Sequence, residues 1–164
     1  KHREITLEFV TPTQIESVGV QRPFPLPELV FRLLYERILK QDGLQLPFQL
    51  EPASVEVFAA YYIEISDYNI TCVTGLPLKH GSTRAFRGWI TYRLLNRNDD
   101  LRRRADTALK KTEGSNLASI CDHIEQHITA YASLTHLLSQ FAFFSSIGKH
   151  TGQGMGMVRQ LNPR

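Results

Sequence analysis

A glycine-rich segment near the end of the chain is the strongest chemical signal in the sequence. Four glycines lie between residues 148 and 156, and Lys149 and His150 stand between the first two of them. Glycine lets backbone N–H groups approach a ligand closely, and consecutive N–H groups in such turns form concave anion sites. A lysine adds a compact positive charge. We therefore expect a phosphate-holding loop made of Gly148, Lys149, His150, Thr151, Gly152, Gln153, Gly154 and Gly156.

Two well-known phosphate loops differ from this segment. A P-loop has a glycine five positions before its Gly-Lys pair and a Ser or Thr directly after it, whereas this chain has Phe143 and His150 there. A dinucleotide-binding fingerprint follows a strand and opens a helix, and here the order of the two elements is reversed. The alternative is a glycine-rich turn that only reverses the chain into an edge strand.

Basic residues are concentrated in the middle of the chain. Residues 76–104 hold eight Lys or Arg against two Asp, although the whole chain carries a net charge of only +3. Arginine suits bidentate phosphate contacts and stacking on bases. We expect Arg84, Arg87 and Arg93 to contact RNA, and a solvated charged face is the alternative.

Metal and cofactor chemistry finds little support in the sequence. His123 and His127 share a helix face, but a zinc site usually needs three or four ligands and no second cluster supplies the rest. We therefore expect no metal and no cofactor. Cys72 and Cys121 form no disulfide framework, which favours a reducing cytoplasm. No apolar run approaches the ~18 residues of a membrane span, so no membrane association is expected.

Hydrophobic periodicity predicts the elements that position these residues. In chain order we expect a strand over 3–10 that ends at Thr11-Pro12-Thr13, a helix from 27 to the Asp42-Gly43 pair, strands over 60–70 and 85–95 joined by a long turn over 74–83, one long helix or two abutting helices over 117–144, and a strand over 155–161. Residues 44–58 receive no assignment, and 96–116 are interpreted as a polar insertion. This βαββαβ order is α+β and ferredoxin-like, with two helices on one face of a four-stranded antiparallel sheet.

The predicted strand over 85–95 places chemistry on one face. Arg87, Trp89, Thr91 and Arg93 alternate with the apolar residues of the opposite face. Such a face could stack on bases and pair with the charges of RNA. The alternative is a solvated face with its tryptophan packed under an insertion.

Three segments in this order resemble a known family. They are FVTPT (Phe9–Thr13), FRGWITYRL (Phe86–Leu94) and IGKHTGQGMG (Ile147–Gly156). Together they resemble the C-terminal domain of the CRISPR-associated repeat-processing endoribonucleases, members of the RAMP superfamily. The likeness runs from about Ile5 to Leu161, apart from the stretch around 96–116.

The resemblance implies a fold, an activity and partners. Family members pair two ferredoxin-like domains, bind CRISPR repeat RNA and cut it without a metal, with the 2′-hydroxyl of the RNA as nucleophile. Residues 1–164 would then be one domain, the C-terminal half of such a protein, and the general base would belong to the N-terminal half. The chain opens without Met, which agrees with residues upstream. The implied partners are CRISPR repeat RNA and the N-terminal ferredoxin-like domain, with effector-complex subunits or a second copy as further candidates.

Only one residue of this chain is a candidate for the chemistry itself. Cleavage by a 2′-hydroxyl needs a proton acceptor, a proton donor and cations for the developing charge. His150 alone stands beside the predicted phosphate site, with Lys149 and Arg84 or Arg87 as charge stabilisers. RNA contact by His150 without catalysis is the alternative. Two other functions stay open: a non-catalytic RNA-binding RAMP subunit, and a ferredoxin-like interaction domain with no RNA role.

Overall fold

An antiparallel sheet of four strands carries the fold, in the order β4-β5-β1-β6. A computed structural model describes residues 3–43, 46, 50–78, 81–95 and 115–161. The main strands are β1 (Glu4–Thr13), β4 (Ile63–Leu78), β5 (Gly81–Leu94) and β6 (Val158–Leu161), and a separate ribbon pairs β2 (Ile15–Ser17) with β3 (Val20–Arg22). The helices are α1 (Pro27–Ile38), α2 (Pro52–Tyr62), α4 (Ser115–Gln126) and α5 (Ile128–Ser145), followed by the short 3-10 helix η1 (Thr151–Gln153).

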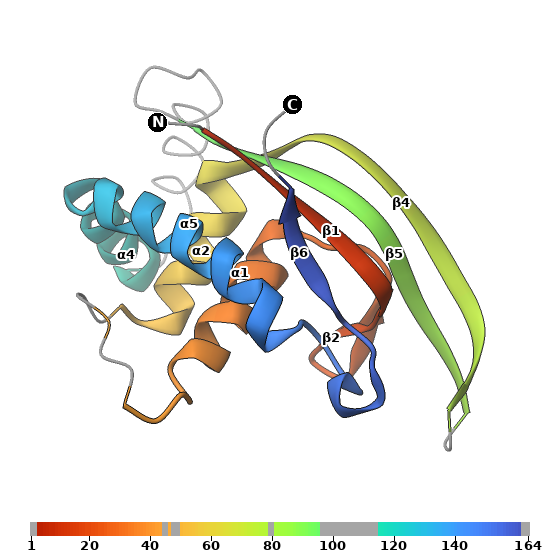
Figure 1. Ribbon diagram of the computed structural model, residues 1–164. Coiled ribbons are helices and arrows are strands. Elements are labelled where there is room, and N and C mark those ends of the chain that lie inside the picture. Colours follow the sequence, from red (N-terminus) through yellow and green to blue (C-terminus); the bar gives the residue numbers. More distant parts are fainter. Residues whose placement is uncertain (1–2, 44–45, 47–49, 79–80, 96–114, 162–164) are drawn as a thin grey trace.

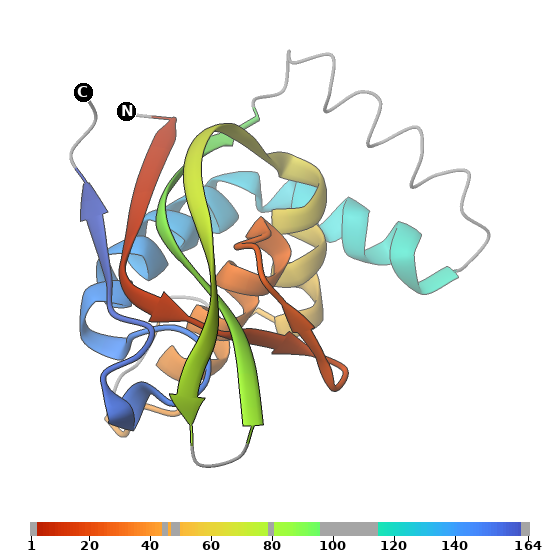
Figure 2. The same ribbon diagram turned by 90° about the vertical axis from the view of Figure 1, so that its right-hand side faces the viewer.

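The helices lie on one face of the sheet and leave the other face open. Figure 1 shows α1, α2 and α5 to the left of β1 and β6, on one side of the sheet, and Figure 2 shows α4 extending away from the sheet. The first strand, β1, lies between β5 and β6, and β4 lies at the edge beside its hairpin partner β5, which is the ferredoxin-like arrangement. The predicted α+β ferredoxin-like fold is confirmed.

Alternating apolar residues of β1 and β5 form the sheet side of the core. Ile5, Leu7 and Phe9 are at most 1% exposed, as are Ile90 and Tyr92 on the neighbouring strand. The period of two that predicted both strands therefore also predicted which side chains face the helices. The buried hydroxyl of Tyr92 donates a hydrogen bond to the Pro25 carbonyl at 2.7 Å, which satisfies a polar group inside the core.

The strand β1 runs further than expected. Thr11-Pro12-Thr13 was predicted to end it, but β1 continues to Thr13, which pairs with Phe86. Pro12 is tolerated because the register shifts between Phe9 and Thr13, so its missing N–H removes no regular ladder bond. At the other end of the chain, β6 begins at Val158, three residues later than predicted.

The hairpin β4–β5 is confirmed, but the long turn predicted over 74–83 is wrong. The strands stay paired through Val73↔Ala85 and as far as Leu78↔Gly81, with a register shift between Val73 and Leu76 at Gly75. Glycine there adopts a φ of +75°, so it bends the strand without ending it. The strand predicted to begin at residue 60 is also wrong over residues 60–62, which belong to α2.

The helical region after residue 115 contains two abutting helices, as one of the two expectations had it. His127 separates α4 from α5. The predicted insertion over 96–116 lies almost entirely outside the described residues. Among the described helices, none is long and apolar enough to cross a membrane.

Candidate nucleic-acid interface

Arg37 anchors the start of the glycine-rich segment. It lies in the last turn of α1, and its guanidinium donates to the carbonyls of Ser145, Ser146 (3.0 Å) and Gly148 (2.6 Å). The carbonyls of Ser145 and Ser146 lie at the C-terminus of α5. The last carbonyls of a helix have no partner within the helix, and a positive charge is favourable there. Burial lowers the pKa of Arg37, but arginine starts so high that it stays charged at neutral pH.

Most described amides of the segment pair within the molecule. Lys149 N–H donates to the Gln14 carbonyl at 2.9 Å, and Gly156 N–H donates to the Pro12 carbonyl at 3.0 Å. The amides of Gln153, Gly154 and Met155 bond inside the loop itself. These N–H groups are therefore occupied by internal acceptors, and they fix the loop against the end of β1.

The glycines of the segment serve different purposes. A Cβ on Gly148 would lie 2.2 Å from the Gln14 carbonyl oxygen, and one on Gly156 would lie 1.9 Å from the Ile147 oxygen. These two allow close approach of backbones inside the protein. Gly154 has open space but a φ of +81°, whereas Gly152 has neither a positive φ nor a neighbour within 4 Å.

The charged side chains of the loop differ in how they are held. Lys149 forms an ion pair with Glu16 of β2, and about half of the lysine side chain remains exposed. His150 is exposed and adopts a left-handed conformation with φ 59° just before η1. Within the described part of the chain, its imidazole has no hydrogen-bond partner that would orient it as a general base.

The structure brings the loop and two of the three candidate arginines to one end of the sheet. Thr13 at the end of β1 pairs with Phe86, and the next residue, Gln14, accepts the Lys149 amide. Arg84 and Arg87 flank Phe86 on β5, and both are exposed without a carboxylate partner among the described residues. Arg93 lies toward the other end, opposite Glu4, and pairs with Glu64.

The open face of the sheet carries the predicted alternation of β5. Arg87 and Trp89 reach this face because Phe86 and Ile90 are buried on the other. Trp89 is partly exposed between Glu8 of β1 and Asn69 of β4, which are its register partners. Glu8 is in turn held by Arg159 of β6.

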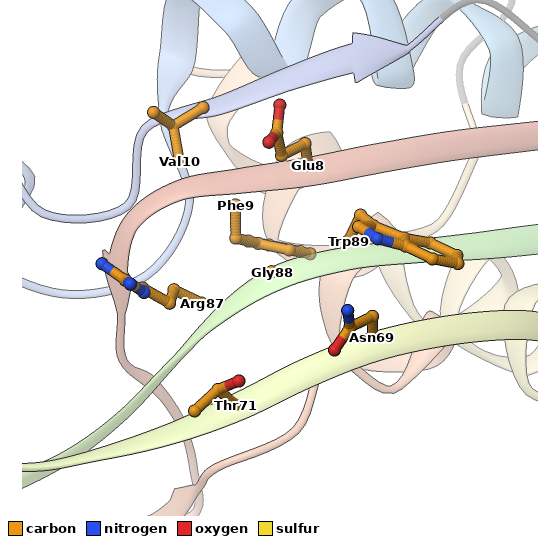
Figure 3. A pocket seen from close by; sticks show the side chains of 8 residues that line it. All are labelled: Glu8, Phe9, Val10, Asn69, Thr71, Arg87, Gly88 and Trp89. Atoms are coloured by element: carbon orange, nitrogen blue, oxygen red, sulfur yellow. The ribbon is translucent and has the colours of Figure 1, made fainter.

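A hollow of about 280 Å³ opens on this face beside Trp89. Figure 3 shows the indole of Trp89 next to the amide of Asn69, with Arg87 further along β5. Its lining residues are Glu8, Phe9, Val10, Asn69, Thr71, Arg87, Gly88 and Trp89.

The histidine pair of the C-terminal helices is placed as its spacing predicts. The rings of His123 and His127 are 4.6 Å apart, and His123 Nδ1 lies 3.1 Å from the hydroxyl of Tyr131. In the described ranges, no group of three or more His, Cys, Asp or Glu side chains could hold a metal ion.

Sequence reasoning missed several residues of this surface. Arg37 carried only the signal of a basic residue in the last turn of a helix, and nothing in the sequence showed that it reaches a loop 111 residues away. Glu16, which neutralises part of the Lys149 charge, was missed as well. Asn69 and Thr71 are typical polar residues of an exposed strand face, so only the register reveals that they lie beside Trp89 and Arg87.

Comparisons with known proteins agree on one family. A family model described as "CRISPR-associated endoribonuclease Cas6" matches residues 7–158. No curated protein is similar enough to this chain to count as a relative.

Solved structures of Cas6 proteins are similar in fold. Thermus thermophilus Cas6 is 22% identical with a TM-score of 0.61, and the match covers 98% of this chain and 54% of that chain. A Cas6 product complex is 21% identical with a TM-score of 0.60, covering 98% and 52%. A Cas6 substrate mimic complex is 21% identical with a TM-score of 0.58, covering 97% and 53%. The chain therefore spans about half the length of these structures, and identities this low show a shared fold.

Proposed function

Because the chain belongs to the CRISPR-associated endoribonuclease Cas6 family, we propose that it is the RNA-binding, C-terminal ferredoxin-like half of a protein that cuts precursor CRISPR RNA within its repeats. The family match over residues 7–158 carries this proposal. The substrate is CRISPR repeat RNA, and the cut needs no metal. The N-terminal ferredoxin-like half of the same protein is the principal partner.

The charges at one end of the sheet support RNA binding. Arg84 and Arg87 are exposed and have no carboxylate partner in the described part of the chain, and Lys149 lies on the loop next to this strand end. Cations without internal partners can neutralise RNA phosphates, and this releases the counterions condensed on the RNA. Arg93 contributes less, since Glu64 already neutralises it.

The glycine-rich segment binds RNA through side chains and shape more than through a cradle of amides. Its amides at Lys149, Gly154 and Gly156 are used inside the protein. The segment therefore presents Lys149, His150 and Thr151 from a backbone that is fixed by Arg37 and by the end of β1.

This chain supplies binding and placement of the scissile phosphate, and the general base comes from elsewhere. A general base has to be oriented within hydrogen-bond reach of the proton that it removes. Nothing in the described structure orients the exposed His150 imidazole. Replacing His150 with Ala in a protein that contains both halves should therefore reduce single-turnover repeat cleavage by less than tenfold, compared with the ~10²–10⁴ of a lost acid–base group.

RNA affinity as a function of salt tests the proposal. CRISPR repeat RNA should bind the 164-residue chain with an affinity that falls steeply as salt rises. The double variant Arg84→Ala, Arg87→Ala should lower the slope of log affinity against log salt by about 1.4, since each single-strand phosphate contact contributes roughly 0.7. Arg22→Ala removes one positive charge from an exposed site on β3 and should leave the slope closer to that of the wild type.

Two results would contradict the proposal in different ways. An RNA affinity that does not change with salt concentration would favour a ferredoxin-like interaction domain with no RNA role. Tight binding without cleavage by the protein that contains both halves would favour a non-catalytic subunit of a CRISPR effector complex.

A further inference from the structure

We propose that the hollow beside Trp89 binds one unpaired nucleobase of the RNA, with the indole as stacking platform and the Asn69 amide as reader of the base edge. The inference rests on the proposed RNA-binding function and adds a subsite to it. The ligand class is a single-stranded nucleotide whose base is free to leave its own stack.

The hollow is produced by irregularities in two neighbouring strands at the same level. Gly88 has a φ of +126°, and a Cβ at this position would lie 2.0 Å from the Asn69 carbonyl oxygen. Phe9 pairs with Gly88, and the register of β1 shifts between Phe9 and Thr13. Both strands therefore depart from regular geometry next to the hollow, and a regular flat sheet would offer no such depression.

The groups around the hollow match the parts of a nucleotide. Trp89 offers a partly exposed aromatic face, on which any base can stack. Asn69 is the direct register partner of Trp89 on β4, so its amide donor and acceptor lie at the side of the stacked ring. An asparagine amide can bond two positions of an adenine edge at once.

Arg87 is placed to bind the phosphate of the same nucleotide. It lies two residues from Trp89 on the same face, roughly 7 Å along the strand, a separation comparable to that between a base and its own phosphate. Thr71 is its register partner and adds a hydroxyl. Glu8, the one carboxylate of the lining, is engaged by Arg159 and so is partly neutralised.

The size of the hollow fits one base. Its volume of about 280 Å³ is slightly below that of typical ligand pockets, roughly 300–1,000 Å³, and so suits a small flat group such as one base. A base within a duplex is not a suitable ligand, because stacking on Trp89 needs a free face of the base and bonding to Asn69 needs a free edge.

Trp89 makes the experiment direct, because it is the only tryptophan of the chain. Its fluorescence is followed while the 164-residue chain is titrated with a short oligoadenylate, and in parallel with an abasic ribose-phosphate oligomer of equal length. Oligoadenylate should quench the indole to saturation, and the abasic oligomer should bind about tenfold more weakly without quenching.

Variants assign the roles. Trp89→Ala should lower oligoadenylate affinity about tenfold, measured by the anisotropy of labelled RNA, and Trp89→Phe should retain most of it because phenylalanine still stacks. Asn69→Ala should reduce the preference for oligoadenylate over oligouridylate. Gln160→Ala removes an exposed amide from β6, opposite the core-facing Leu7, and should change neither.

The outcomes separate this inference from the proposed function. If both oligomers bind equally, with normal salt dependence and an unchanged indole signal, RNA binding stands and the base site is wrong. If neither oligomer nor repeat RNA binds, both proposals fail. If a protein that contains both halves binds RNA but keeps Trp89 shielded from quenching, the hollow is a protein-docking surface and the base site is again overturned.

Discussion

Arg37 and Gly148 are joined by a 2.6 Å hydrogen bond from the guanidinium to the glycine carbonyl, although 111 residues separate them in sequence. The bond ties the first glycine of the loop to α1, a helix whose Leu34 and Tyr35 are fully buried in the core. The start of the loop is therefore tied to a helix that is packed in the core.

Replacing Arg37 with Ala should destabilise the protein by about 2–4 kcal/mol. Hydrogen bonds to a charged group contribute about 1.5–3 kcal/mol each, and the substitution also leaves the carbonyls of Ser146 and Gly148 without this donor. The free energy of unfolding from urea denaturation measures the loss. Arg37→Lys should recover only part of the lost stability. Lysine restores the positive charge, but its ammonium cannot reach all of the acceptors that the guanidinium spans.

Lys40→Ala is the matched control, since Lys40 is an exposed cation just beyond the same helix. We expect it to stay within about 0.5 kcal/mol of the wild type. An Arg37→Ala variant as stable as this control would show that the three carbonyls do not depend on the guanidinium.

Two glycines of the loop should differ strongly in their response to the same substitution. Gly156→Ala places a Cβ 1.9 Å from the Ile147 oxygen at a φ of +74°, so we expect a loss of more than about 2 kcal/mol or failure to fold. Gly152→Ala meets open space at an ordinary φ and should change stability by less than about 1 kcal/mol. Thermal unfolding of the two variants side by side measures the difference.

Gly152→Ala has a second use, because it leaves the loop folded. Gly152 has neither a positive φ nor a neighbour within 4 Å that a Cβ would meet. A drop in RNA affinity for this variant would therefore report a direct contact with RNA.

The ion pair between Lys149 and Glu16 gives a prediction of opposite signs. Lys149→Ala should weaken RNA binding and lower its salt slope by about 0.7, whereas Glu16→Gln should strengthen binding by releasing the lysine. Stability should move by less than about 1 kcal/mol in both, as for other exposed pairs. Equal RNA affinities for both variants and the wild type would show that Lys149 does not bind RNA, and would favour a role in docking to the other half of the protein.

Tyr92 predicts how stability depends on alkaline pH. Burial, with a smaller contribution from the negative Glu28, raises the pKa of Tyr92 well above its ordinary value of 10. The unfolded chain loses this proton at about pH 10, so the stabilisation is complete below that pH and is lost as the pH rises further.

Tyr92→Phe tests this by removing the ionisable group. The variant should lose about 1 kcal/mol at neutral pH, because the bond to Pro25 disappears, and its stability should fall less steeply above about pH 10. Burial also raises the pKa of Tyr131, so a residual slope is expected. Urea midpoints measured from neutral pH upward give both slopes, and identical slopes would contradict the assignment.

Elements with a clear period were predictable, and elements whose signal competes with a neighbour were not. The core faces of β1 and β5 follow the alternation of their residues. Helix α2 was missed although Val55, Phe58, Ala59 and Tyr62 have helical spacing, because the alternation of Tyr61, Ile63 and Ile65 overlaps its end. Residues 60–62 fit both a helical and an alternating pattern, and they are helical in the structure because the apolar face of α2 is buried in the core.

The candidate site shows the same division between local and long-range information. The loop, Arg84 and Arg87 could be found because residue type and spacing mark them. The contacts that hold the loop could not, because Arg37, Gln14 and Glu16 reach it across most of the chain. A turn of this composition also looks the same whether its amides face a ligand or internal acceptors.

The strand β4 lies at an edge of the sheet and, among the described residues, pairs with β5 alone. A straight edge of this length would attract strands of other molecules and promote aggregation. Register shifts after Ile65 and after Val73 divide it into shorter stretches that a foreign strand cannot follow in register. The bends of β4 are thus expected to keep the protein in solution at high concentration.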